Sequence, residues 1–476
     1  MRLVDRITGR NMGTAMLLGL AVLWFGAGAG LVVPGEGRAE SIQLQRLTFS
    51  KEDVVSYPSM DEAGKLVAYR HELLDPTKGE KVASVRVLQV DGLISKVIFT
   101  DGTLKAPPPH EAYFLVCGTK PPVISGGGGK VVFSLSLGAP VSLEDHYLGV
   151  ANTDGSGLKV LSLRNEELAR HDWRKLGFMD DTWRSLSQYR ISHDGQEIAC
   201  LVKGHLGPRD WPMPSGILLL RTDGSAQRTL LAPKLGEKAW VWEGYPRMPF
   251  TGGGWVFELS GNGKKLLFGA QSSADKEDYD LYTMDADGKG IKKVTDIKDR
   301  WLVRGDLSND GNTLSLFYSG RKLDGMGTYV SGFGKEGFRP LSSKFTDRVD
   351  FKELSGNGRR IVHRVQGHGL FVIEAGGEEF QVFNERTGAI QGVKEGVDFP
   401  NFPSFWSPRF LSATGDRAVV EAVPSGKERK ELFLMRLAAP GRDAAVHCPV
   451  CGRPMTAGWK FCPYDGTPLP LGTQQQ

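Results

Sequence analysis

The sequence lacks the short motifs that mark several common catalytic classes. It contains no G-x-S-x-G nucleophile elbow, no H-E-x-x-H metalloprotease motif and no G-x-x-x-x-G-K-[ST] phosphate loop. It also lacks an excess of charge of one sign, because 59 Lys and Arg residues face 55 Asp and Glu residues, for a formal net charge of +4. This near balance argues against nucleic acid or an acidic membrane surface as a partner. From the sequence we assign no catalytic residue.

Glycine, in contrast, is abundant, with 61 residues and no collagen-like period. Residues 255–296 show its use, because they read as two β-hairpins in series. Ser260-Gly-Asn-Gly263 separates two apolar runs, and Asp287-Gly288 separates two further short strands. Gly and Asn accept the positive φ that a tight turn requires. We therefore expect one antiparallel sheet of four short strands.

The same turn recurs along the chain before apolar, β-rich runs, with five clear copies and two looser ones, Asp61-Glu-Ala-Gly64 and Ser125-Gly-Gly-Gly128, that would make seven. Its last glycine falls at positions 64, 128, 195, 263, 311, 358 and 415, in steps of 47 to 68 residues. Such a period suits a four-stranded propeller blade with variable loops. The sequence thus predicts an all-β fold, a β-propeller of four-stranded antiparallel blades. Seven blades are favoured, and six stay open as an alternative.

The stretch Leu281-Tyr-Thr-Met-Asp-Ala-Asp-Gly-Lys-Gly290 through Val294-Thr295, with Ser-x-Asp/Asn-Gly turns before apolar strands, resembles the TolB-type propeller repeat. The resemblance covers roughly residues 42–440, and we delimit the propeller as residues 40–440. Several copies lack the proline of the common Ser-Pro-Asp-Gly form. The resemblance implies an extracytoplasmic binding scaffold, while related blades form the lid domain of prolyl-oligopeptidase-like enzymes. Only 36 residues follow Pro440, too few for the hydrolase domain of such an enzyme.

Residues 1–39 predict an export signal or a membrane anchor. Residues 11–35 carry no charged side chain and follow Arg2, Arg6 and Arg10. Gly37-Arg-Ala39 offers small residues to a signal peptidase, which favours a cleaved signal peptide ending near Ala39. The alternative is an uncleaved single-span anchor. Both alternatives place the propeller outside the cytoplasm, in the periplasm or secreted.

Residues 441–476 resemble a zinc ribbon. Cys448 and Cys451 form one C-x2-C knuckle, and Cys462 with Asp465 repeats the spacing. The resemblance implies cysteine at the fourth position, so Asp465 is a departure, although zinc accepts carboxylate oxygen. His447 is an alternative fourth ligand, and a disulfide-linked or metal-free tail is the alternative to a structural Zn2+ site.

Two other features have simple structural interpretations. Asp285 to Asp296 mimics the spacing of an EF-hand calcium loop, but Lys289 occupies a ligand position and the flanks are strand-like, so we interpret it as a hairpin. Cys117 and Cys200 lie in predicted strands, where buried free thiols are the simplest account and a disulfide between them is the alternative.

For function, the sequence favours a non-enzymatic extracytoplasmic scaffold that binds a protein or a cell-envelope component. The alternative is a propeller hydrolase or lyase that acts on a glycan or peptide in the central channel, where loops of successive blades converge. The lining of the channel distinguishes the two hypotheses. Clustered carboxylates would favour the enzyme, and an apolar or mixed rim would favour the scaffold.

Overall fold

The computed structural model divides the chain into two compact units, Met1–Arg38 and Ala39–Gln476. All residues that the structure describes belong to the second unit. They are 43–49, 53–75, 79–108, 110–138, 145–163, 185–203, 215–231, 233–235, 240–242, 256–271, 279–295, 300–320, 327–332, 339–342, 349–365, 369–374, 379–384, 397–398, 410–424, 429–437, 446–447 and 454–455. Within these ranges every regular element is a β-strand, and no helix is long and apolar enough to span a membrane.

The repeated turn forms as its residues dictate. In the copy that begins at Ser260, the amide of Gly263 donates to the carbonyl of Ser260 at 2.9 Å, with Gly263 at φ +70°. The Ser260 hydroxyl accepts from the amide of Lys265 at 2.9 Å and donates to Oδ1 of Asn262 at 2.7 Å. All seven turn glycines have φ between +66° and +72°, which is the left-handed region that favours glycine. The turn is therefore encoded by serine, Asx and glycine together.

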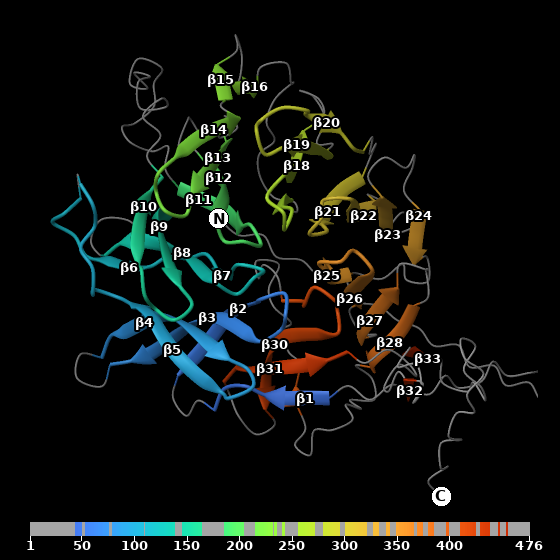
Figure 1. Cartoon of the computed structure of the whole chain (residues 1–476), viewed down its shortest axis with the longest axis horizontal. Coiled ribbons are helices and arrows are strands. Elements are labelled where there is room, and N and C mark those ends of the chain that lie inside the picture. The colour runs from blue at the N-terminus through green and yellow to red at the C-terminus, as the bar shows by residue number, and fades with distance from the viewer. Residues whose placement is uncertain are drawn as a thin grey trace, which may run out of the picture. The chain divides into compact units, whose positions relative to one another are not determined.

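Six antiparallel sheets have four strands each, and successive sheets follow one another around a ring (Figure 1). Blade 1 is β2 (Val54–Met60), β3 (Leu66–Leu74), β4 (Lys81–Gln89) and β5 (Ile94–Thr100). Blade 3 is β11 (Ser185–Ile191), β12 (Glu197–Lys203), β13 (Ser215–Arg221) and β14 (Gln227–Leu231). Blade 4 is β17 (Phe257–Leu259), β18 (Lys265–Gln271), β19 (Tyr279–Asp285) and β20 (Lys292–Lys293).

The remaining four-stranded blades complete the second half of the ring. Blade 5 is β21 (Arg300–Leu307), β22 (Thr313–Gly320), β23 (Gly327–Gly332) and β24 (Arg339–Ser342). Blade 6 is β25 (Val349–Leu354), β26 (Arg360–Val365), β27 (Gly369–Glu374) and β28 (Glu379–Asn384). Blade 7 has the strand order β1 (Gln43–Arg46), β31 (Glu431–Arg436), β30 (Arg417–Pro424) and β29 (Val397–Asp398).

Blade 2 differs by having five strands. They are β6 (Leu115–Cys117), β7 (Val123–Ile124), β8 (Lys130–Leu137), β9 (Asp145–Asn152) and β10 (Lys159–Ser162). Both β6 and β7 pair with β8, so together they fill the one strand position that β2 fills in blade 1. The described sheets therefore form seven blades. Two small two-stranded sheets accompany them, β15 (Pro233–Leu235) with β16 (Trp240–Trp242) and β32 (Val446–His447) with β33 (Pro454–Met455).

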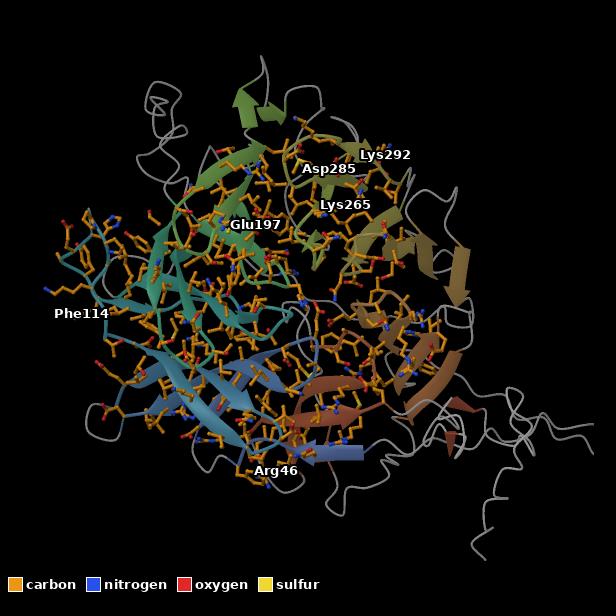
Figure 2. All side chains as sticks on the ribbon, in the orientation of Figure 1. Arg46, Phe114, Glu197, Lys265, Asp285 and Lys292 are labelled. Carbon is orange, nitrogen blue, oxygen red and sulfur yellow. The ribbon has the colours of Figure 1, made fainter. Side chains whose placement is uncertain are left out.

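Blade 7 joins the beginning of the propeller to its end. β1 pairs with β31, and the amide of Leu47 extends the ladder to the carbonyl of Leu432 at 2.8 Å. Arg46, labelled at β1 in Figure 2, forms a two-pronged ion pair with Glu431, whose side chain is almost fully buried. Bidentate pairing of this kind is among the stronger charge contacts in proteins. The blade is thus completed by a strand that lies nearly 400 residues away in sequence.

The seven repeated turns are linked to one another by a closed circuit of backbone hydrogen bonds. Each turn donates an amide to a carbonyl of the next, at 2.6–3.0 Å, and the last turn donates back to the first. The donor and acceptor pairs are Glu62 to Gly126, Gly127 to His193, His193 to Gly261, Asn262 to Asn309, Asn309 to Gly356, Asn357 to Ala413 and Ala413 to Glu62. This circuit, which we call the turn ring, confirms closure with seven blades.

The hydrophobic core lies between neighbouring sheets. One cluster joins blade 7 to blades 1 and 6, and others fill the spaces between blades 1 and 2, 2 and 3, and 3 and 4. Cys117 and Cys200 lie in these cores as free thiols, as predicted, and burial raises the pKa of each. Blades 1 to 4 each contribute apolar side chains to two such clusters, so contact with both neighbours stabilises each of them.

The structure also bears on other predicted features. β19 and β20 pair as the predicted hairpin, with Lys265 on the neighbouring strand 3.7 Å from Asp285 (Figure 2). The export segment 1–39 and the metal ligands Cys448, Cys451, Cys462 and Asp465 lie outside the described residues.

Candidate functional site

The turn ring places seven equivalent residues side by side, namely the second residue of each turn. They are, in chain order, Glu62, Gly126, His193, Gly261, Asn309, Gly356 and Ala413. Three members of this set are large and polar, namely Glu62, His193 and Asn309. In chain order, one glycine of the set lies between each of them and the next. The seven positions share one backbone environment. The alternation of large residues with glycine must therefore reflect how neighbouring side chains fit together.

Those glycines are required because neighbouring side chains fill the space above them. A Cβ atom added to Gly126 would lie 2.1 Å from Oε1 of Glu62 and 2.5 Å from Nδ1 of His193. One added to Gly261 would lie 2.7 Å from Cβ of Asn309, and one added to Gly356 would lie 2.3 Å from Nδ2 of the same residue. Glu62, His193 and Asn309 therefore lie over the glycine turns beside them.

Glu62 of blade 1 and His193 of blade 3 meet above the intervening turn of blade 2. Nδ1 of His193 lies 2.9 Å from Oε1 of Glu62, an ion-pair distance when the imidazole is protonated. The glutamate side chain is 16% exposed and the histidine side chain 50% exposed. Oε1 itself is buried and receives no aligned hydrogen bond. The pair, which we call the Glu62–His193 dyad, thus combines a buried oxygen with a solvent-accessible imidazole.

Charged residues, three of them carboxylates, occupy a second set of equivalent positions, two residues before the turn on the innermost strands. Arg190 precedes the turn of blade 3 in this way, and Glu258, Asp306 and Glu353 do so in blades 4, 5 and 6. Glu258, Asp306 and Glu353 line one pocket together with Glu62, and Asn309 and Ala413 of the turn ring also contribute. The pocket therefore brings together four carboxylates from four blades.

Arg190 is the cation that faces these carboxylates. Its Nε and Nη2 atoms donate to the two oxygens of Glu258 at 2.8 and 2.6 Å. Burial alone would lower the pKa of Arg190, but Glu258, and more weakly Asp306 and Glu353, raise it above its ordinary value. The fork holds the Glu258 carboxylate in one orientation.

The other two strand carboxylates are held by neutral donors. Glu353 accepts from the amides of Phe410 at 3.1 Å and Leu411 at 3.3 Å, both in blade 7. Asp306 accepts from the Ser315 hydroxyl at 3.2 Å. Both acidic side chains are buried to about 95%. Buried carboxylates fixed by specific donors are typical of sites where charge is needed.

This arrangement is suited to acid–base chemistry on a bound substrate. A carboxylate oriented by Arg190 and a second one in contact with an imidazole line the same pocket. Proton transfer by positioned groups of these types contributes about 10²- to 10⁴-fold to enzymatic rates. In the part of the chain that the structure describes, no group of three or more His, Cys, Asp or Glu residues is arranged to hold a metal ion.

None of these side chains belongs to a catalytic motif that the sequence shows. A signal was present: aligning the repeats on their turn glycines places Arg190, Glu258, Asp306 and Glu353 in one column. The same column holds Ser59, Val123 and Phe410 in the other blades. In those three blades the residue at this position is uncharged and buried. The four charged residues at the same position in blades 3 to 6 therefore indicate a shared site.

Comparison with known proteins identifies the fold. No family model matches the sequence, and no curated protein matches it. An oligogalacturonate lyase in complex with manganese matches with a TM-score of 0.51 at 10% identity, over 83% of this chain and 93% of the other. An oligogalacturonate lyase from Vibrio parahaemolyticus matches with a TM-score of 0.52 at 10% identity over the same shares. The propeller domain of the Trilobed protease from Pyrococcus furiosus matches with a TM-score of 0.48 at 12% identity, over 82% and 99%.

The expectation of a non-enzymatic scaffold is wrong. The pocket lining also contains apolar side chains, but four carboxylates cluster in it, which is the arrangement expected of the enzyme. Of the similar solved structures, the two with a TM-score above 0.5 are named as lyases. The scaffold was inferred from the repeat and from missing motifs, and neither reports which side chains converge in the channel. These findings favour the alternative, an enzymatic propeller.

Proposed function

We propose that this protein is a propeller enzyme that cleaves a glycan, by hydrolysis or elimination, in its central channel. The observation that carries the proposal is the convergence of Glu62, Glu258, Asp306 and Glu353 on one pocket. Cleavage of a glycosidic bond needs one group that protonates the leaving oxygen and a second that acts as base or nucleophile. The likeness to the two oligogalacturonate lyases supports a glycan over a peptide.

The side chains divide naturally between these roles. Glu258, oriented by Arg190, is our choice for the base or nucleophile, because its two oxygens are held by the guanidinium fork. Glu62 is our choice for the proton donor, because its Oε1 contacts an imidazole that can supply a proton. Asp306 and Glu353 add negative charge, which stabilises positive charge that develops on the sugar during bond cleavage.

The same charge bears on the substrate. A pocket with four carboxylates and Arg190 repels a polyanion, since fields of one sign add in a low-dielectric channel. We therefore propose a glycan of neutral or amine-bearing sugars. For such a substrate hydrolysis is the expected reaction, because elimination requires a sugar that carries a carboxyl group beside the acidic C–H bond.

The test is a panel of neutral, amine-bearing and uronate oligosaccharides, with peptides added as a separate arm. Hydrolysis releases reducing ends without ultraviolet absorbance, whereas elimination also yields an unsaturated, absorbing product. We expect Glu258→Gln to reduce kcat by about 10²-fold or more. Glu80→Gln, at an exposed residue, is the matched control and should retain full activity. Cleavage of peptides alone, or full activity in Glu258→Gln, would refute the proposal.

The remaining sequence expectations stand as proposals. We propose that residues 1–39 direct export or anchor the chain, so that a TolB-like propeller acts outside the cytoplasm, where a protein or envelope component is its expected partner. We also propose that Cys448, Cys451, Cys462 and Asp465 hold a structural Zn2+ ion. Metal analysis of the purified protein should find about one zinc per chain. The double variant Cys448→Ser/Cys462→Ser should lose it, whereas Cys200→Ser should not.

A further inference from the structure

The Glu62–His193 dyad has a geometry that the cleavage reaction alone does not require. We propose that His193 is a proton relay, which returns protons from solvent to Glu62 after each turnover. This inference rests on the proposed function, because it assigns a partner to the group that protonates the leaving oxygen. Glu62 would be the catalytic residue that touches the substrate, and His193 a positioning residue that acts through it.

The exposures of the two side chains support this division. Glu62 lines the pocket, its side chain is 16% exposed, and its Oε1 is buried. A group that connects such a carboxylate to bulk water provides a route for its proton. His193 contacts that buried oxygen at 2.9 Å, and half of its side chain is open to solvent. An imidazole can both accept and donate a proton through its two ring nitrogens, which suits it to carry the proton.

The backbone holds the imidazole in position. The amide of His193 donates to Gly261 at 2.6 Å, and its carbonyl accepts from Gly127 at 2.8 Å. The imidazole lies over the glycine pair of blade 2, with Nε2 3.6 Å from the position of a Cβ on Gly127. A relay group has to keep its geometry through repeated transfers, and attachment to the turn ring provides that rigidity.

The two aspartates next to the dyad in sequence accept hydrogen bonds from groups of their own turns. Asp61, beside Glu62, accepts from the amides of Lys65 and Leu66 at 2.7 and 2.9 Å. Asp194, beside His193, accepts from the Ser192 hydroxyl at 2.6 Å and the Gln196 amide at 3.0 Å. On the pocket side, Glu258, Asp306 and Glu353 are the charged groups that line the pocket with Glu62, and Arg190 interacts with these three. Glu62 is thus the carboxylate that contacts Nδ1 of His193.

The relay can be written as a balanced sequence of proton transfers. As the glycosidic bond breaks, the electron pair passes to the leaving oxygen, and Glu62 donates its proton there. The imidazole turns so that its Nδ1–H bond points at Oε1 of Glu62, which receives no aligned hydrogen bond in this structure, and the ionised Oε1 then takes the proton from the protonated His193. The neutral imidazole then regains a proton from water or buffer at its exposed side. Hydrolysis also consumes one water molecule: its oxygen bonds to the sugar carbon as the glycosidic bond breaks, and its proton passes to Glu258 and from there to solvent, so that bonds and protons balance.

The test compares His193→Ala, His193→Gln and Glu62→Gln, with His110→Ala as the matched control. His110 lies outside the channel, where its Nδ1 contacts the hydroxyl of Tyr147 at 2.6 Å. We expect His193→Ala to reduce kcat by about 10²-fold with KM unchanged, and added imidazole to restore part of the loss. Imidazole should not restore Glu62→Gln, and His110→Ala should remain fully active without it.

His193→Gln guards against a folding defect, because glutamine keeps a hydrogen-bonding side chain but carries no titrating proton. It should show the same loss of kcat with an unchanged unfolding midpoint. If wild type cleaves the glycan and Glu62→Gln does not, but either His193 variant keeps wild-type kcat, the relay is wrong and the proposed function stands. A loss in His193→Ala that imidazole fails to restore also overturns the relay. Absence of cleavage by the wild type across the panel refutes the function itself.

Discussion

Gly126→Ala is the substitution that most directly tests the dyad, because it changes neither charge nor hydrogen-bonding groups. The added Cβ would lie 2.1 Å from Oε1 of Glu62 and 2.5 Å from Nδ1 of His193. To reach an ordinary contact of 3.4 Å, the two atoms must withdraw by about 1.3 and 0.9 Å. A misplacement of about 1 Å can reduce the rate about 10²-fold. We therefore expect a loss of kcat of that order.

Folding stability should hardly change in this variant. The φ of Gly126 is not in the left-handed region, so alanine fits the backbone and stabilises by about 0.4–1 kcal/mol through the unfolded chain. The partly exposed dyad contributes about 0–1 kcal/mol to the free energy of unfolding, and its loss offsets that gain. The net change is expected within about 1 kcal/mol of zero.

Gly129→Ala, in the same segment, is the matched control. Its added Cβ would meet no atom within 4 Å, and its φ is also outside the left-handed region. It should raise the free energy of unfolding by about 0.4–1 kcal/mol and leave kcat unchanged. Urea titrations and steady-state kinetics on both variants measure the two quantities. Full activity in Gly126→Ala would refute a role for the dyad. A decrease in the free energy of unfolding of more than about 2 kcal/mol would show that the side chains of Glu62 and His193 cannot move away from the added methyl group.

Three further substitutions test the structure by urea unfolding. Arg190→Met should lower the free energy of unfolding by about 3 kcal/mol, because Glu258 is left unpaired, and adding Glu258→Gln should recover part of it. Asp310→Asn should change stability by less than about 0.5 kcal/mol at pH 7, since Asn262 fills the equivalent place naturally. Burial acts to raise the pKa of Asp310, but hydrogen bonds from the Ser308 hydroxyl and from Asn312 outweigh it and hold the pKa below the ordinary value of 3.8. The wild type should therefore lose stability as the pH falls through this range, and Asp310→Asn should lose less. Gly358→Ala, with φ +70° and a Cβ 2.7 Å from a threonine hydroxyl, should cost at least about 1–2 kcal/mol, and a neutral result would contradict the required conformation.

The blades could be predicted because their signal is local. Serine, Asx and glycine within four residues define each turn, and apolar strands flank it, so the seven glycines predict seven hairpins. The first copy shows how tolerant the pattern is. Asp61 replaces serine there, and its carboxylate accepts the amide of Lys65 in place of a hydroxyl. The hydrogen bond to the turn's first side chain is therefore kept although aspartate takes the place of serine.

The site could not be predicted in the same way, because it depends on which blades become neighbours. Glu62 and His193 are 131 positions apart, and only the curvature of the ring brings them together. The need for Gly126 is likewise invisible in its own segment, where Gly126, Gly127, Gly128 and Gly129 look alike. Local propensity describes each turn, whereas the site arises from contacts between turns.

An odd number of blades has a consequence for the turn ring. Large and small residues can alternate without a break only around a ring with an even number of members, so a seven-membered ring must contain one mismatch. Here the mismatch is the adjacent pair Gly356 and Ala413, which separates Asn309 from Glu62. Gly356, Ala413, Asn309 and Glu62 all line the pocket that contains the four carboxylates. The other three members of the ring, Gly126, His193 and Gly261, do not. The parity of the ring thus breaks its pseudo-symmetry, and the pocket lies in the sector where the break occurs.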